Sequence, residues 1–381
     1  MRIALVRKDY TRAKGGAEGY TVALSFALAA AGHEVHVFAS NIEAEQARGI
    51  RFHLVPVPRA RTFLRHVWFA RNAERLLRQD EFDIINGLSR IWWQDIYRSG
   101  DPLFIHWLRC HPPNIIDRVL GPLNPKQRIM LSIERKVFRS SSLRRVIAIS
   151  EMDSRLIERY YGIAPEKIKV IYNGVDHRRF NPGNRVHLSE VRSRLGVPRD
   201  AVLLLFVGMD FKRKGLCYLL DALRLLGPEL RRVHCLVVSG DDPRKYRLQA
   251  LRDGTGPHVT FAPATEQIGE VYAAADIFAF PTLYDPFANV HLEALASGLP
   301  VITTASAGGA EVIRNGENGF VVPHAQDTKR MAECVLELLD SQARLRMSEN
   351  AARSAGSFTI ERNVREVASL YEEVFAEKGR C

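Results

Sequence analysis

Long apolar runs and paired cysteines are both missing from this 381-residue sequence. No stretch of about 18 or more uncharged apolar residues occurs, so no membrane-spanning helix is expected. Met1 leads directly into the apolar run Ile3–Val6, without the charged and apolar segments of a signal peptide, which predicts a cytoplasmic location. The five cysteines are scattered and include no Cys-x-x-Cys pair, so we expect core thiols in a reducing compartment and no metal site.

Basic residues are concentrated in the first half of the chain. Residues 1–172 contain 28 Lys and Arg against 17 Asp and Glu, whereas residues 173–381 contain 26 of each. The excess is greatest from Arg98 to Arg145, where ten basic residues accompany three acids. Such a segment suits an anionic surface of phospholipid or phosphorylated glycolipid, although a solvated helix face is the alternative. No nucleic-acid-binding module accompanies the charge, so nucleic acid is not expected as a partner.

Short apolar runs alternate with helical or polar segments throughout the first half. Ile3–Val6, the helical segment Tyr20–Ala31 and Glu34–Ala39 form a βαβ unit. Further strand-like runs lie at residues 52–57, 83–87, 103–107 and 146–150. This alternation predicts an α/β domain with a parallel sheet covered by helices.

A polar segment from Asn173 to Arg185 interrupts the pattern, and a second series of strands follows it. These strands are expected at residues 202–207, 234–239, 259–262, 277–280, 301–304 and 319–322. We therefore predict two doubly wound, Rossmann-like domains facing across a cleft, residues 1–172 and 173–359. The last helix, in residues 360–381, is expected to pack back on the first domain. Ligands of such sheets bind beyond the carboxyl ends of the strands.

One candidate site is the segment Pro281–Pro300, which follows a strand and opens a helix. Backbone N–H groups at a helix start can bind phosphate. The candidates for this role are Phe287, Ala288, Asn289 and Val290. Asp285 and Glu293 lie on either side of the helix start, where each charge-assisted bond to a sugar hydroxyl contributes roughly 1.5 to 3 kcal/mol. The alternative is an acidic loop with a helix-capping role.

A second candidate is the loop GMDFKRKG, from Gly208 to Gly215, which contains three adjacent cations. The planar guanidinium of Arg213 can bind a phosphate through two hydrogen bonds, and Lys214 adds a point charge. Together these two residues suit a diphosphate, whereas a merely basic turn is the alternative.

The two acids and the cationic loop resemble those of the retaining glycosyltransferases with the GT-B fold. That family carries two acids separated by seven positions, and Asp285 and Glu293 match them. The resemblance implies that Asp285 contacts the transferred sugar, that Glu293 binds the donor ribose, and that Arg213 and Lys214 neutralise the diphosphate. The first acid of the family is usually Glu, and Ala288 stands where the family usually has glycine.

The resemblance extends to the first half of the chain. Gly15 and Gly16 resemble the family's glycine-rich turn beside the reacting sugar. His106, at the end of the strand-like run that begins at Leu103, resembles the histidine that contacts the transferred sugar; a structural histidine is the alternative. Asp95 and Arg98 are candidates for the acceptor side.

A narrower resemblance is to glucosyltransferases of the lipopolysaccharide inner core. It is carried by QDIYRSGD at residues 94–101, VGMDFKRKGL at 207–216 and SGDDPRKY at 239–246. It implies transfer of glucose from UDP-glucose to a lipid-linked, phosphorylated glycan, with retention and without cofactor or metal, at the inner face of the bacterial inner membrane. Transferases that use GDP-mannose or UDP-N-acetylglucosamine, a UDP-sugar epimerase and a non-catalytic binding protein stay open as alternatives.

Overall fold

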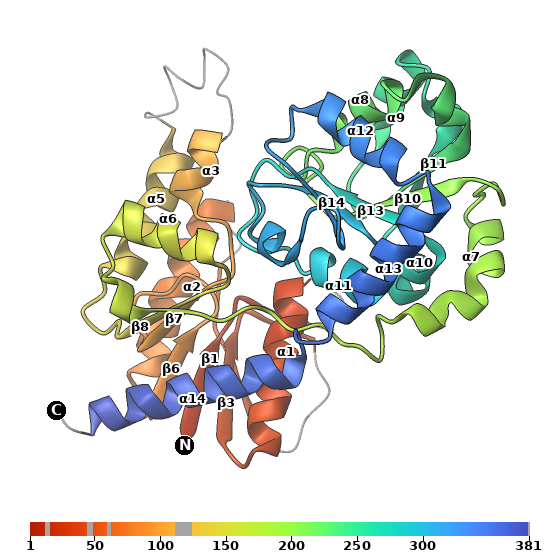
Figure 1. Cartoon of the computed structure of the whole chain (residues 1–381). Coiled ribbons are helices and arrows are strands. Elements are labelled where there is room, and N and C mark those ends of the chain that lie inside the picture. The colour runs from red at the N-terminus through yellow and green to blue at the C-terminus, as the bar shows by residue number, and fades with distance from the viewer. Residues whose placement is uncertain (12–15, 44–48, 59–61, 111–123, 380–381) are drawn as a thin grey trace. The chain divides into compact units, whose positions relative to one another are not determined.

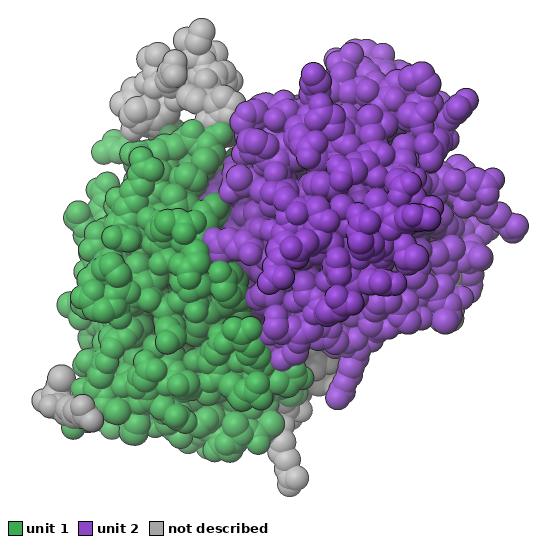
Figure 2. All heavy atoms as spheres, in the orientation of Figure 1, with its two compact units in different colours: residues 1–172, 360–381 green, residues 173–359 purple. Residues whose placement is uncertain are grey.

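The computed structural model describes residues 1–11, 16–43, 49–58, 62–110 and 124–379 (Figure 1). The chain divides into two compact units, which Figure 2 colours separately. Unit 1 comprises residues 1–172 and 360–381, and unit 2 comprises residues 173–359. These are the ranges predicted for the two domains. None of the described helices is both long and apolar enough to cross a membrane.

Unit 1 contains a sheet of seven parallel strands in the order β5-β3-β1-β6-β7-β8-β9. The strands are β1 (Arg2–Val6), β3 (Glu34–Ala39), β5 (Ile50–Leu54), β6 (Ile84–Gly87), β7 (Ile96–Ser99), β8 (Arg145–Ala148) and β9 (Ile168–Val170). A separate parallel pair is formed by β2 (Asp9–Thr11) and β4 (Asn41–Glu43). The chain proceeds outward from β1 through β3 to β5 and then returns to β6, on the other side of β1. The direction of winding therefore reverses between β1 and β6.

Helices cover this sheet, and the C-terminal helix belongs to the same core. The described helices of unit 1 are α1 (Gly16–Ala30), α2 (Thr62–Leu77), α3 (Phe104–Cys110), α5 (Pro125–Phe138), α6 (Glu151–Tyr161) and α14 (Ile360–Lys378). Val367 and Leu370 of α14 lie in one apolar cluster with Ile3 and Leu5 of β1. Tyr371 is fully buried there and its hydroxyl accepts a hydrogen bond from Asn86 at 2.5 Å. Side-chain burial thus fixes α14 to unit 1 although it follows unit 2 in sequence (Figure 1).

Unit 2 contains a six-stranded parallel sheet in the order β12-β11-β10-β13-β14-β15. The strands are β10 (Val202–Val207), β11 (Val233–Ser239), β12 (Val259–Pro263), β13 (Ile277–Phe280), β14 (Val301–Thr304) and β15 (Gly319–Val322). Its α-helices are α7 (Leu188–Arg194), α8 (Leu216–Arg224), α9 (Arg244–Arg252), α10 (Ile268–Ala274), α11 (Val290–Ala296), α12 (Thr328–Glu337) and α13 (Ser341–Ala355). Here the winding reverses between β10 and β13.

The predicted strand at residues 103–107 is wrong, because Phe104–Cys110 forms α3. The buried carboxylate of Glu134 accepts hydrogen bonds from the backbone N–H groups of Phe104 at 2.6 Å and Ile105 at 3.1 Å. These N–H groups have no partner inside the helix, so a distant acid stabilises the helix start. His106 therefore lies on a helix rather than at the end of a strand.

The strand β7 was not predicted. Its sequence, IYRS, includes two polar residues, yet all four side chains are buried. Arg98 is buried with its guanidinium carbon 3.8 Å from the centre of the Tyr20 ring, a favourable cation–π arrangement. Tertiary contacts with α1 therefore allow a charged residue inside a central strand.

Candidate active site

The cationic loop of unit 2 follows β10, and it is joined to the loop that follows β13. The backbone N–H of Leu283 donates to the carbonyl of Arg213 at 2.8 Å, and the Thr282 hydroxyl donates to the same carbonyl at 2.9 Å. Gly215 has φ +75°, and a Cβ at this position would lie 1.9 Å from the carbonyl oxygen of Pro281. The contact between the two loops therefore requires glycine at residue 215. It occurs where the winding of the sheet reverses, which is where open α/β sheets bind ligands.

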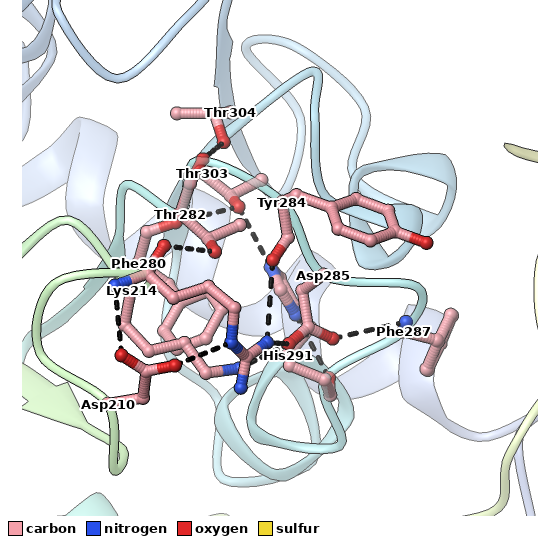
Figure 3. Close-up of polar contacts among 12 residues, drawn as sticks. Asp210, Lys214, Phe280, Thr282, Tyr284, Asp285, Phe287, His291, Thr303 and Thr304 are labelled. Atoms are coloured by element: carbon pink, nitrogen blue, oxygen red, sulfur yellow. Dashed lines mark hydrogen bonds and ion pairs between the residues drawn. The ribbon is translucent and has the colours of Figure 1, made fainter. Parts of the chain in front are cut away.

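Asp285 is the centre of the polar contacts in this region (Figure 3). One carboxylate oxygen accepts from Arg213 Nη1 at 2.8 Å and is paired with Lys214 Nζ. The other accepts from the backbone N–H of Phe287 at 3.1 Å. Burial would raise the pKa of Asp285, but Lys214 and Arg213 more than offset it and hold that pKa below its usual value. A charged carboxylate thus links the two loops.

Internal contacts hold Arg213 and Lys214, the two side chains that are predicted to bind phosphate. Arg213 Nε donates to Asp210 at 3.0 Å, and Asp285 and Asp210 raise the pKa of Arg213 although burial opposes them. Lys214 is 8% exposed and lies 4.7 Å from the centre of the Phe280 ring. Burial lowers the pKa of Lys214, which Asp285 partly offsets. The cations therefore keep fixed directions beside Gly208, the first residue after β10.

Glu293 lies in α11, and its carboxylate has one clear hydrogen-bond donor. The hydroxyl of Tyr272, a fully buried residue of α10, donates to Glu293 Oε2 at 2.9 Å. Burial raises the pKa of Glu293, and Tyr272 and Arg179 counteract this effect. No ion pair of Glu293 is found among the residues that the structure describes. The side chain is thus oriented by Tyr272 while its charge is left for another partner.

The loop from Phe287 to Val290 carries the predicted backbone ligands, and a histidine fixes its geometry. Burial lowers the pKa of His291 to about 4, so its imidazole is neutral near pH 7. Its Nδ1 donates to the carbonyl of Ala288 at 3.0 Å, and its Nε2 lies 2.8 Å from the Thr303 hydroxyl, which donates to the carbonyl of Phe280 at 3.0 Å. Sequence reasoning missed this residue, although a histidine among the apolar residues of VHLEALA was a visible signal.

Of the four residues predicted to bind phosphate in this loop, three also contribute to the local structure of the protein. The Phe287 N–H is already bonded to Asp285. The side chain of Asn289 accepts a hydrogen bond from Asn173 at 2.6 Å, and its backbone carbonyl accepts from Glu293 N–H at 3.0 Å. Val290 is the first residue of α11. Hydrogen bonds within unit 2 therefore hold this loop in place. The loop is still a candidate for binding phosphate.

In unit 1, Gly15 lies outside the described residues, and Gly16 is the first residue of α1. The half-buried His106 of α3 has Nδ1 3.0 Å from the Tyr160 hydroxyl and Nε2 3.2 Å from Cys110 Sγ. Burial lowers the pKa of His106, and Arg109 adds to this effect. These effects favour the neutral imidazole, which suits a hydrogen-bonding role.

Asp95 is misassigned as an acceptor-side residue. It precedes β7, at the amino ends of the strands, and its Oδ2 accepts from the backbone N–H of Ile85 at 2.8 Å and from Lys378 Nζ at 3.1 Å. Ligands bind at the opposite edge of such a sheet. Asp95 therefore attaches α14 to unit 1.

Comparison with known proteins agrees with this geometry. Residues 14–179 match the model of Glycosyltransferase Family 4, and residues 201–341 match that of Glycosyl transferases group 1. The lipopolysaccharide glucosyltransferase WaaG of Escherichia coli (strain K12) is 26% identical over 346 residues, 90% of this chain and 91% of that protein. The spore coat protein SA of Bacillus subtilis (strain 168) is 32% identical over 249 residues, but this match covers only 61% of the chain and 66% of that protein.

Solved structures also match this chain over nearly its whole length. The crystal structure of WaaG, 25% identical, gives a TM-score of 0.85 and covers 97% of this chain and 99% of that one. The structure of Anabaena Alr3699/HepE in complex with UDP-glucose, 20% identical, gives a TM-score of 0.73 over 98% of this chain and 100% of the other. The chain is a glycosyltransferase with the GT-B fold, as the two Rossmann-like units and the family models show together. In particular, it is similar over nearly its whole length to the lipopolysaccharide glucosyltransferase WaaG.

Proposed function

We propose that this glycosyltransferase transfers glucose from UDP-glucose to a lipopolysaccharide-core or related glycolipid, with retention of the anomeric configuration and without a metal ion. The observation that carries the proposal is the cluster of Arg213, Lys214 and Asp285 where the winding of the unit 2 sheet reverses. The similarity to WaaG, a lipopolysaccharide glucosyltransferase, supports the proposed acceptor. The similarity to HepE, whose structure contains UDP-glucose, supports the proposed donor.

Arg213 and Lys214 can bind a diphosphate and still keep their ion pairs with Asp285. A guanidinium has five N–H donors and an ammonium has three, so Arg213 and Lys214 can contact phosphate oxygens while each keeps one bond to the carboxylate. The second oxygen of Asp285 would then accept a hydrogen bond from a hydroxyl of the transferred sugar, in place of the hydrogen bond from the Phe287 N–H. That exchange frees the Phe287 N–H for the diphosphate. The donor would therefore replace one internal hydrogen bond by two external ones.

Glu293 would bind the ribose, since its carboxylate can accept from vicinal hydroxyls while Tyr272 holds one oxygen. In the transfer itself, the bond between the sugar C1 and the diphosphate oxygen breaks as the acceptor oxygen attacks from the same face. The departing diphosphate takes the acceptor proton. Arg213 and Lys214 stabilise the charge that develops on it, which is the role a metal ion has in other transferases.

The exposed cations of unit 1 support an anionic membrane surface as the place of the acceptor. Arg128 and Arg135 of α5 and Arg139, the C-cap of that helix, are exposed at intervals of seven and four residues, which places them on one side of it. Each cation near an anionic surface contributes about 1 kcal/mol. Replacing all three by Gln should release the protein from phosphatidylglycerol vesicles at physiological salt, as co-sedimentation would show. Undiminished binding would contradict the membrane assignment.

Calorimetric titration with UDP, GDP and ADP, with and without EDTA, tests the donor assignment. UDP should bind selectively and with the same affinity in EDTA. Glu293→Gln should weaken UDP binding by roughly 2 kcal/mol because the ribose loses a charged acceptor, whereas Glu317→Gln, an exposed control, should have no effect. Preference for GDP would instead favour a mannosyltransferase, and conversion of UDP-glucose without acceptor would favour an epimerase.

A further inference from the structure

The winding of the unit 1 sheet reverses between β1 and β6, and the loops that follow these two strands are joined. The backbone N–H of Lys8, after β1, donates to the Ser89 hydroxyl, after β6, at 3.1 Å. The guanidinium of Arg7 donates to the carbonyl of Leu88 at 2.6 Å. This edge of the sheet is therefore built like the donor site of unit 2, and by the same rule it is a place for a ligand.

Several cations lie at this edge, and only some of them form ion pairs with acids among the described residues. Arg7 lies 3.5 Å from Asp101, and Arg90 lies 3.8 Å from Asp101 and 3.1 Å from the buried Glu134. Three further basic side chains are Lys8 and, in the first two turns of α2, Arg65 and His66. Across the described ranges of the chain, no side-chain hydrogen bond or ion pair is found for these three.

Lys8 follows β1 and α2 follows β5 in the same parallel sheet, so Lys8 and the start of α2, which carries Arg65 and His66, lie at the same carboxyl edge. Lys8 and His66 are half-buried. Burial lowers the pKa of Lys8, Asp9 and Asp101 oppose this effect, and Arg65 and Arg7 add to it. Burial lowers the pKa of His66 to about 4, with Lys8 and Arg90 adding to the effect and Asp101 opposing it. The cations of this group, which are Lys8, Arg7, Arg65 and Arg90, therefore outnumber the acids that act on Lys8 and His66, which are Asp9 and Asp101.

In unit 2 the corresponding cations are paired directly with Asp285, whereas among the described residues of unit 1 no acid forms an ion pair with Lys8 or Arg65, and Asp9 and Asp101 act on Lys8 only at longer range. We propose that Lys8, Arg65 and His66 form an anion-binding subsite that takes a phosphate monoester carried by the acceptor glycan. An anion here would complete the charge balance and direct the acceptor toward the carboxyl edge of the sheet. The inference rests on the proposed function for the identity of its ligand, but not for the existence of the subsite.

NMR of the His66 imidazole tests the subsite directly, with inorganic phosphate, mannose 6-phosphate and mannose as probes and His66→Gln to assign the signal. Both phosphates should shift the signal saturably and raise the pKa of His66, because an anion offsets the neighbouring cations; mannose should do neither. Lys8→Gln and Arg65→Gln should abolish the response. Arg71→Gln, an exposed arginine of the same helix, should retain it. No shift with either phosphate would overturn the proposal.

The source of the anion is tested by comparing mannose 6-phosphate with glycerol 3-phosphate, which represents a lipid headgroup. Tighter binding of the sugar phosphate supports an acceptor glycan, and the reverse order overturns that assignment. With a phosphorylated core oligosaccharide as acceptor, Lys8→Gln should raise the acceptor KM at least tenfold, with kcat changed by less than about twofold. An unchanged acceptor KM would also overturn the proposal.

UDP calorimetry separates this inference from the proposed function. If UDP binds normally in Lys8→Gln, unit 2 is intact and a lost His66 response reports on the subsite alone. If the wild-type protein shows the phosphate response but binds no UDP, the subsite stands and the proposed donor is wrong.

Discussion

Both units place cations at the carboxyl edge of a parallel sheet, but only in unit 2 are both cations of the candidate site paired with an acid among the described residues. In unit 2, Lys214 is buried, Arg213 is half-buried, and both cations are paired with Asp285. In unit 1, Lys8 and Arg65 form no ion pair with an acid among the residues that the structure describes. The difference shows that the Rossmann-like sheet determines where a ligand can lie. A few loop side chains determine whether the cations at that edge are already paired with an acid.

The largest effect is expected from Gly215→Ala, which would abolish the contact between the two loops of unit 2. The new Cβ would meet the Pro281 carbonyl at 1.9 Å, and φ is +75°, so we expect unit 2 to lose more than about 3 kcal/mol of stability. Hydrogen exchange resolved by peptide would show faster exchange in unit 2 and unchanged exchange in unit 1.

Gly254→Ala is the matched control for that change. Gly254 also has a positive φ, +74°, but nothing lies within 4 Å of the position of its Cβ. It should cost only about 1 kcal/mol. Equal effects of the two substitutions would mean that backbone conformation, rather than the contact with Pro281, explains the need for Gly215.

The next effect is expected from Asp285→Asn, which makes the charge balance of unit 2 resemble that of unit 1. Arg213 and Lys214 would lose a shared anion, so UDP should bind at least as tightly as before. Turnover should fall roughly 10- to 100-fold, because the transferred sugar loses a charged acceptor. Calorimetry and steady-state kinetics measure the two quantities separately.

Asp210→Asn is the control for Asp285→Asn, since Asp210 also contacts Arg213 but is exposed. Its φ is +65°, which Asn tolerates. Turnover should change little. If Asp285→Asn instead weakened UDP binding and spared turnover, Asp285 would serve to orient the cations rather than to contact the sugar.

The smallest effect concerns a buried acid of unit 1. Asp153 is fully buried, and burial raises its pKa to about 7, although Ser99, the Ile149 backbone and Arg98 oppose this. A raised pKa in the folded state means that stability is lost as pH rises from about 4 to 7. Asp153→Asn should remove this loss and make unit 1 more stable by roughly 1 to 3 kcal/mol at pH 8, with a smaller gain at pH 5.

Hydrogen exchange of unit 1 at the two pH values measures this difference. Asp285 should behave in the opposite way, because its pKa is lowered and its contribution is lost as pH falls. A gain for Asp153→Asn that did not depend on pH would show that packing, rather than ionisation, explains it.

Strands of unit 2 could be predicted almost residue by residue. Val202–Val207 and Ile277–Phe280 are continuous apolar runs, and they are strands with those bounds. Their burial on both faces leaves an unbroken signal in the sequence. By contrast, β7 was missed because buried Arg98 and Ser99 interrupt the pattern, and α3 was mistaken for a strand because its start depends on Glu134, some 30 residues away in sequence.

The sequence by itself determined the α/β class, the two domains and the residues of the donor loops, because local periodicity and short motifs contain that information. Tertiary structure decided how those residues are paired. Only the folded chain brings Asp285 to Arg213 and Lys214, more than 70 residues earlier, and leaves Lys8 without an ion pair among the described residues. Burial and electrostatic pairing depend on contacts between distant segments, so no local pattern could reveal which cations were already compensated.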